Sequence, residues 1–240
     1  MTKAREQKGQ IIVTGASRGI GAAIALELTR RGHIVAGTSR NGETAVGPGH
    51  ALEVTDDAAI IRTIAAIAAR GPIIGLVNNA GIYETSPSDK LTSAVFEHTI
   101  RTNTTSVVVA SREVYPHLKS NGGGLIVNIG SFFDKLGVAE HVAYCASKAA
   151  IAAITRCHAV EWAADNIRVM NVAPGYIETD FNREFLSKDK VRSWLSKRIP
   201  ARRPGTPEEV AKLVASLFSE NIGFMTGETI YIDGGQGMNH

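Results

Sequence analysis

Residues 14–21 read Thr14-Gly15-Ala16-Ser17-Arg18-Gly19-Ile20-Gly21 and indicate the fold most clearly. This stretch follows an apolar, β-branched run and opens an Ala-rich helical pattern. Glycines at 15, 19 and 21 let the backbone turn tightly and approach a pyrophosphate, and the free amide groups at the start of the helix then point at the negative charge. A plain tight turn would also use glycine, but the position between strand and helix favours a dinucleotide-binding loop.

Outward from this loop, β-branched runs alternate with helical patterns along the whole chain. The predicted strands are residues 10–14, 34–38, 51–54, 74–78, 125–129, 168–172 and 229–232, and the predicted helices are 20–31, 57–69, 107–118, 142–164 and 207–217. Near-continuous apolar strands are typical of a parallel sheet that is buried on both faces. Regular β-α-β alternation implies right-handed crossovers, so we expect a doubly wound α/β sheet in a single domain over residues 1–240.

Composition excludes several classes of function. The chain has 240 residues, 44% hydrophobic and 20% charged, which suits a folded α/β domain with a sizeable core. A net charge of +3 spread along the sequence argues against nucleic-acid binding. No apolar run is long enough for a membrane span or a signal peptide. Cys145 and Cys157 show no metal-ligand spacing and fit a reducing compartment. We therefore expect a cytoplasmic protein without a metal site.

One long segment interrupts the alternation. Residues 176–204 separate a strand from the last helix, are rich in charge and follow the Pro174-Gly175 turn. Ligands bind at the carboxyl ends of the strands in open α/β sheets, so an excursion at this place is expected to be a substrate lid. The alternative is a solvated helical pair that only covers the core.

The end of the second strand indicates which dinucleotide is bound. An NAD site usually has an acidic residue here, bonded to the ribose 2′-hydroxyl. This chain instead has Thr38-Ser39-Arg40 at the end of the strand, and the next carboxylate is that of Glu43. Arg40 and Arg18, with the hydroxyls of Ser17 and Ser39, could hold a 2′-phosphate. The sequence therefore favours NADP(H), with NAD(H) as the alternative if Arg40 is merely a solvated loop residue.

Four polar residues form a candidate catalytic set. Tyr144 and Lys148 are four residues apart in a helical pattern and share a face. An adjacent ammonium, together with the positive charge of an oxidised nicotinamide, would favour the phenolate. This would bring the pKa of the tyrosine into the range needed for acid–base catalysis. Ser131 ends the preceding strand, where its hydroxyl could bond the substrate oxygen, and Asn103 could hold a water that links Lys148 to solvent. Taken one at a time, these residues also have non-catalytic explanations. The spacing of Tyr144 and Lys148 could arise by chance, and Ser131 could simply cap a loop.

Together these residues resemble the short-chain dehydrogenase/reductase family over essentially the whole chain. The matching motifs are residues 14–21, Asn78-Asn79-Ala80-Gly81, Asn103, Ser131, Tyr144 with Lys148, Pro174-Gly175 and Asp233-Gly234-Gly235, in the family's order and spacing. The resemblance implies an NAD(P)(H)-dependent oxidoreductase with a seven-stranded Rossmann sheet, usually a homotetramer. The long Ala-rich helical pattern that carries Tyr144 would suit packing between subunits, or simply burial against the sheet.

The resemblance also implies roles for individual residues. Tyr144 would protonate the carbonyl oxygen in reduction or act as the base in oxidation, while Lys148 would bind the nicotinamide ribose and lower the pKa of the tyrosine. Ser131 would orient the substrate, and Asn103 would complete a proton relay. The predicted cofactor site comprises Gly15, Ser17, Arg18, Gly19, Ile20, Gly21, Ser39, Arg40, Val54, Asn79, Ala80, Gly81, Tyr144, Lys148, Pro174, Gly175, Ile177 and Thr179.

The substrate is less clearly indicated. The predicted pocket is formed by Ser131, Phe133, His141, Tyr144 and Tyr176, although a structural role for His141 is an alternative. The stretch 172–180 resembles the 3-oxoacyl-(acyl-carrier-protein) reductase subgroup. Leu125 and Asp165 stand where those reductases tend to present basic residues to the acidic carrier, which makes a carrier-protein partner doubtful.

The expected function is NADPH-dependent reduction of a small ketone or 3-oxo ester or thioester. The alternatives are an oxidative, NAD-dependent secondary alcohol dehydrogenase and a 3-oxoacyl-(acyl-carrier-protein) reductase of fatty acid synthesis. A scaffold or regulator of the same fold would commonly lack the tyrosine or the lysine, and a halide-eliminating relative would have a filled cofactor loop. This chain keeps Tyr144, Lys148 and the glycines.

Overall fold

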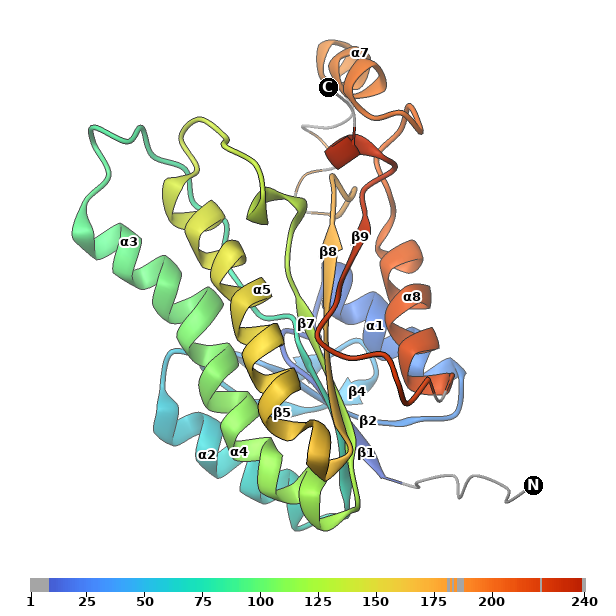
Figure 1. Ribbon diagram of the computed structural model, residues 1–240. Coiled ribbons are helices and arrows are strands. Elements are labelled where there is room, and N and C mark those ends of the chain that lie inside the picture. Colours follow the sequence, from blue (N-terminus) through green and yellow to red (C-terminus); the bar gives the residue numbers. More distant parts are fainter. Residues whose placement is uncertain (1–8, 181, 183, 185–187, 221, 239–240) are drawn as a thin grey trace.

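The computed structural model describes residues 9–180, 182, 184, 188–220 and 222–238, and its centre is a sheet of seven parallel strands (Figure 1). The strands are β1 (Gln10–Val13), β2 (Ile34–Ser39), β5 (His50–Ala51), β6 (Ile73–Asn78), β7 (Gly124–Ile129), β8 (Ile167–Pro174) and β9 (Thr229–Ile232). Their order is β5-β2-β1-β6-β7-β8-β9. The chain builds outward from β1 in one direction and returns to build from β6 in the other. The predicted doubly wound sheet is confirmed, and a crevice is expected where β1 and β6 meet.

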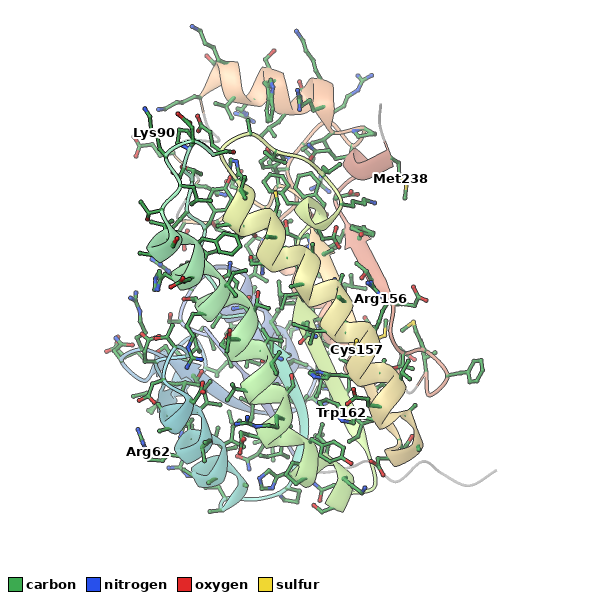
Figure 2. All side chains as sticks on the ribbon, turned by 60° about the vertical axis from the view of Figure 1, so that its left-hand side comes forward. Arg62, Lys90, Arg156, Cys157, Trp162 and Met238 are labelled. Carbon is green, nitrogen blue, oxygen red and sulfur yellow. The ribbon has the colours of Figure 1, made fainter. Side chains whose placement is uncertain are left out.

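Helices cover both faces of the sheet. On one face lie α1 (Gly19–Arg30) and α8 (Pro207–Ser219), and on the other lie α2 (Asp57–Ala68), α4 (Ser106–Ser120) and α5 (Val142–Trp162) (Figure 1). The outward side of α5 carries Arg156 and Cys157, both exposed (Figure 2). None of the helices in the described part of the chain is both long and apolar enough to span a membrane.

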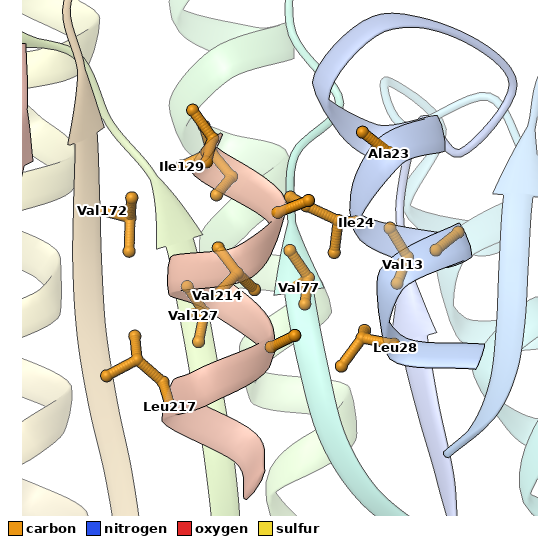
Figure 3. Close-up of a cluster of buried hydrophobic side chains, with 14 of the residues drawn as sticks. Val13, Ala23, Ile24, Leu28, Val77, Val127, Ile129, Val172, Val214 and Leu217 are labelled. Carbon is orange, nitrogen blue, oxygen red and sulfur yellow. The ribbon is translucent and has the colours of Figure 1, made fainter. Parts of the chain in front are cut away.

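Two apolar cores fix the strands in place, one on each face. In the first, Ile24 and Leu28 of α1 meet Val214 of α8 over Val77 and Val127 of the sheet, and all five are fully buried (Figure 3). Burial on this scale holds the carboxyl ends of β1, β6 and β7 in a fixed register, because each Val, Leu or Ile contributes about 1.5–3 kcal/mol when it leaves water. The loops that follow these strands are therefore presented on a rigid frame.

Local signals in the sequence set the ends of α8. Thr206 accepts a hydrogen bond from the amide of Glu209, whose side chain accepts one from the amide of Thr206, and Pro207 occupies the first turn. This reciprocal arrangement satisfies amide groups that the helix itself leaves without partners.

The structure differs from the sequence prediction at three places. The helix predicted from residue 107 begins earlier, with α3 (Ser93–Ile100) and a π-helical turn, Arg101–Thr105, before α4. The strand predicted at 51–54 is the two-residue edge strand β5, after which the chain turns toward the crevice. A short hairpin of β3 (Glu43–Thr44) and β4 (Gly47–Pro48) was not predicted.

The predicted lid region contains α7 (Asp189–Arg198), which lies beyond the carboxyl edge of the sheet (Figure 1). Positions 181, 183 and 185–187 of that region lie outside the described residues. Leu195 and Ile199 are buried against Tyr176 and Val191, in a small cluster separate from the two main cores. The segment thus has its own apolar contacts above the crevice.

Candidate active site

A cleft of about 660 Å³ opens at the carboxyl edge of the sheet, between the loops that follow β1, β2, β6, β7 and β8. The predicted cofactor residues all line it, from Gly15 and Arg18 at one end to Tyr144 and Lys148 at the other. Ser131, Phe133 and Tyr176 of the predicted substrate pocket line it as well, whereas Asn103 and His141 are not among the lining residues. Its size and its mixed polar and apolar lining suit an extended ligand.

The glycine loop has the conformation that its sequence predicts. Gly15 and Gly19 have φ angles of 68° and 57°, in the left-handed region that glycine adopts without strain. At Gly21 a Cβ would lie 2.2 Å from the carbonyl oxygen of Gly15 and 2.3 Å from Nδ2 of Asn79. The third glycine is therefore required for close packing within the loop, while the first two shape the turn.

Hydrogen bonds join this loop to the one after β6. The hydroxyl of Thr14 accepts from the amides of Asn79 and Ala80, both at 3.0 Å. The Asn79 side chain donates to the carbonyl oxygens of Thr14 and Gly15, at 2.9 and 3.2 Å. These contacts explain the Asn79-Ala80-Gly81 motif structurally: it closes the floor of the cleft where the strand order reverses.

The outer end of the cleft is basic. Arg18 and Arg40 are exposed and line the cleft, and neither guanidinium forms an ion pair with any described residue. In contrast, the Ser39 hydroxyl donates a hydrogen bond to the side-chain oxygen of Asn41 at 2.9 Å. The side-chain amide of Asn41 in turn donates to the Glu43 carboxylate at 3.0 Å. Two guanidinium groups that form no ion pair within the described part of the chain, one of them directly before α1, fit a phosphorylated dinucleotide.

Tyr144, Ser131 and Lys148 meet at the inner end of the cleft. Tyr144 and Lys148 lie on one face of α5, and Ser131 lies two residues beyond the end of β7, where it caps the short helix Phe132–Asp134. Ser131 lies near enough to Tyr144 to lower the pKa of its hydroxyl, and its own hydroxyl oxygen accepts a hydrogen bond from the Phe133 amide at 3.2 Å. The Lys148 ammonium is buried, lies 5.7 Å from the centre of the Tyr144 ring and donates to the carbonyl oxygen of Ile129 at 2.8 Å. The structure thus brings three of the four predicted catalytic residues together.

Burial dominates the acid–base properties of this group. It raises the pKa of Tyr144 to about 12, although the neighbouring Ser131 lowers that pKa and the side chain is only partly buried. Burial also lowers the pKa of Lys148 to about 8. The expected lowering of the tyrosine pKa by the lysine is not seen in the protein alone, because desolvation of the phenolate is the larger effect. Tyr144 is a protonated acid at neutral pH.

Asn103 lies one layer behind the cleft, in the π-helical turn between α3 and α4. Its side-chain amide donates to the carbonyl oxygen of Ile82 at 3.0 Å and to the Ser147 hydroxyl at 3.1 Å, and its oxygen accepts from the Ile82 amide at 2.8 Å. Ser147 in turn donates to the carbonyl oxygen of Tyr144 at 2.7 Å. Both amide protons of Asn103 are used within the protein, so a relay through it stays a prediction.

The loop after β8 forms one wall of the cleft. Asn182 orders this loop, since its side chain accepts from the Thr179 amide at 2.7 Å and donates to the carbonyl oxygen of Ile177 at 2.9 Å. Ile177 and Thr179 both line the cleft, as the sequence predicts.

Sequence reasoning missed one residue at the substrate end. Tyr83 lines the cleft beside Tyr144, with ring centres 4.9 Å apart. His141 does not face the cleft; it is hydrogen-bonded to the Tyr83 hydroxyl and packs on Phe133. The only signal in the sequence was that Tyr83 lies two residues beyond the Asn-Ala-Gly motif.

Comparisons with known proteins find similar chains over nearly the whole length. A family model described as enoyl-(acyl-carrier-protein) reductase matches residues 15–237. The 3-oxoacyl-[acyl-carrier-protein] reductase MabA of Mycobacterium bovis is 36% identical over 232 residues, which are 96% of this chain and 93% of that protein. The reductase FabG of Escherichia coli, which has the same descriptive name, is 39% identical over 237 residues, 95% and 96% of the two chains. A gluconate 5-dehydrogenase from Burkholderia cenocepacia, solved with NADP and tartrate, superposes with a TM-score of 0.90 at 30% identity, over 97% of this chain and 96% of that one.

Proposed function

Since this chain belongs to the short-chain dehydrogenase/reductase family of oxidoreductases, we propose that it reduces a ketone to a secondary alcohol with NADPH. The observation that carries the proposal is that Ser131, Tyr144 and Lys148 line the inner end of a cleft whose outer end holds Arg18 and Arg40. That arrangement pairs a proton donor with a site for a phosphorylated dinucleotide. The solved relative with bound NADP supports the choice of cofactor.

Each residue at the inner end has a chemical role in this proposal. When bound, NADPH supplies the hydride that adds to the carbonyl carbon. The Ser131 hydroxyl orients the carbonyl oxygen, and Tyr144 gives its proton to that oxygen, so that the neutral alcohol is formed. The buried Lys148 ammonium stabilises the phenolate that remains. Burial keeps Tyr144 in its protonated form at neutral pH, which is the form that a proton donor needs.

The lid is part of the same proposal. Tyr176 lines the cleft and also packs on Trp194 of α7, with ring centres 5.8 Å apart. We expect residues 176–204 to cover the substrate and exclude water from the inner end.

A carrier-protein thioester is the second candidate substrate, favoured by the names of the most similar relatives. The surface that would dock an acidic carrier differs, however. Leu125 is buried in β7, and Asp165 is held by the Tyr115 hydroxyl at 2.6 Å and by the Lys119 ammonium at 3.1 Å. Neither position presents a free positive charge, so we favour a free ketone or 3-oxo ester.

Loss of nicotinamide absorbance tests the proposal. NADPH and, separately, NADH are supplied with free ketones, small 3-oxo esters, an acetoacetyl thioester of a small thiol and the same thioester on an acyl carrier protein. We expect turnover with NADPH and similar kcat/KM for the two thioesters. A strong preference for the carrier-bound thioester would instead indicate a 3-oxoacyl-(acyl-carrier-protein) reductase. Faster alcohol oxidation with NAD would contradict the reductive assignment.

A further inference from the structure

Tyr144 belongs to a closed cycle of four rings, whose other members are Tyr83, His141 and Phe133. Tyr83 lies 4.9 Å from Tyr144 and 5.1 Å from His141, measured between ring centres. Phe133 closes the cycle, at 5.5 Å from His141 and 6.0 Å from Tyr144. Three separate segments contribute these rings: the loop after β6, the short helix after β7 and the start of α5. Separations of this size and the steep angles between the rings are typical of favourable edge-to-face contacts.

Hydrogen bonds fix the Tyr83 ring in this position. Nδ1 of His141 donates to the carbonyl oxygen of Ala139, which can only accept, so in the neutral imidazole Nε2 accepts the Tyr83 hydroxyl proton. A backbone bond of 2.8 Å from the Ser86 amide to the carbonyl oxygen of Glu140 joins the same two loops. The ring is therefore held by its hydroxyl while half of the side chain, 50%, remains exposed beside the cleft.

The rest of the substrate end is mainly aromatic. Asp180 also lines the cleft, and the Arg198 guanidinium beside Tyr176 lies 4.8 Å from the centre of the Trp194 ring. Phe133 and Tyr176 line the cleft together, with ring centres 6.3 Å apart. Of the described residues that line the cleft, the guanidinium and ammonium groups are those of Arg18, Arg40 and Lys148, which the proposed function assigns to the dinucleotide and to Tyr144. Among those described residues no such group remains to pair with a carboxylate or phosphate on the substrate.

We infer that this site takes an uncharged ketone that carries an aromatic ring near the carbonyl, and that Tyr83, held by His141, is the residue that selects the ring. The inference rests on the proposed function and narrows its substrate class. An aromatic ring placed against Tyr83 would extend the existing edge-to-face contacts, whereas a saturated ring would gain only from burial.

Benzylacetone and its cyclohexyl analogue test this inference. The two ketones have the same chain and nearly the same size, and neither ring is conjugated with the carbonyl, so the hydride step is electronically alike. One edge-to-face contact is worth about 0.5–1.5 kcal/mol, which corresponds to roughly a 2- to 10-fold effect. We expect kcat/KM with NADPH to favour benzylacetone by at least about threefold.

Variants at Tyr83 connect the preference to this ring. Tyr83→Leu should bring the two kcat/KM values close to parity and leave the Kd for NADPH within about twofold. Tyr83→Phe keeps the ring and should retain most of the preference. Phe224→Leu, at a fully exposed position outside the cleft, is the matched control and should change nothing.

The outcomes separate this inference from the proposed function. Equal kcat/KM for the two ketones in the wild-type protein, or an unchanged preference in Tyr83→Leu, would overturn the inference and leave ketone reduction standing. Absence of NADPH oxidation with every ketone and thioester would overturn the proposed function itself.

Discussion

At the scale of single residues, Lys148 is the clearest case of a side chain that destabilises the folded state. It is buried beneath the cleft, and the carbonyl oxygen of Ile129 is its hydrogen-bond acceptor. Burial lowers its pKa to about 8, so the folded protein binds the proton of this group less tightly than the unfolded chain does. The contribution of Lys148 to the free energy of unfolding is therefore most unfavourable below pH 8. It becomes less unfavourable as the pH rises, until the lysine of the unfolded chain also loses its proton.

Replacing Lys148 with Met should stabilise the protein while it removes activity. The apolar chain fills the same space without a buried charge, and we expect the free energy of unfolding at pH 7 to rise by about 1–3 kcal/mol. Urea denaturation of both proteins between pH 6 and pH 10 measures the difference, which should shrink as the pH rises above 8. A Lys148→Met protein that is less stable than wild type at pH 7 would show that the lysine supports the fold.

At the same scale, we expect Arg40 to set the preference for NADPH over NADH. Its guanidinium is exposed at the outer end of the cleft, without an ion-pair partner in the described part of the chain. Arg40→Asp should weaken NADPH binding by about 10- to 100-fold, the worth of a charged hydrogen bond, and leave NADH binding nearly unchanged. Fluorescence titration with both nucleotides measures this. Equal losses for NADPH and NADH would rule out a 2′-phosphate contact.

The sequence predicted those individual residues whose position relative to a strand or helix is set by a motif. The cofactor residues and Ser131, Tyr144 and Lys148 lie around one cleft because each follows a strand or begins a helix that the pattern already located. Tyr83 could not be found in this way. Its importance arises from a ring cycle made by three separate segments, and the raised pKa of Tyr144 depends on burial that only the tertiary structure reveals.

At the scale of elements, strands and helices with strong apolar periodicity were predicted well and weakly patterned ones were not. The missed helical segment, residues 93–105, is rich in threonine and polar side chains, which lower its intrinsic helix propensity. It is stabilised instead by tertiary contacts such as those of Asn103 with Ile82 and Ser147. The edge strand β5 is short because it pairs on one side only, with β2.

The turn from β1 into α1 gives a prediction for that element. In Gly21→Ala the new methyl group would lie 2.2 Å from the Gly15 carbonyl oxygen, so the loop must shift. We expect a loss of about 1–3 kcal/mol in stability and a much weaker affinity for NADPH. Gly223→Ala is the matched control, since its methyl group would meet no atom within 4 Å. Unchanged melting temperature and NADPH affinity in Gly21→Ala would contradict the structural role of this glycine.

At the scale of the whole molecule, the outer side of α5 is the surface on which we expect subunits to pair. Ala149, Ala153 and Cys157 are exposed at four-residue spacing, and Val160 beyond them is 81% exposed. Such a stripe of small and apolar side chains allows two helices to approach closely. The proposed homotetramer would bury it.

Val160→Glu should therefore reduce the assembly state without unfolding the chain, because the position is exposed in the single subunit but a glutamate would be desolvated between subunits. Size-exclusion chromatography with light scattering measures the mass. Ile61→Glu, a comparable exposed change on α2, serves as the control and should leave the mass unaltered. If Val160→Glu keeps the wild-type mass, α5 is not the interface.

The central claim is that Tyr144 delivers the proton that completes NADPH-dependent ketone reduction. Its most direct test is to measure turnover and NADPH affinity in Tyr144→Phe, which keeps the ring and removes only the acidic hydroxyl. We expect kcat to fall by at least about 100-fold, the usual contribution of a positioned acid, and the Kd for NADPH to stay within about twofold of wild type. Turnover near the wild-type rate would mean that another group supplies the proton and would contradict the account.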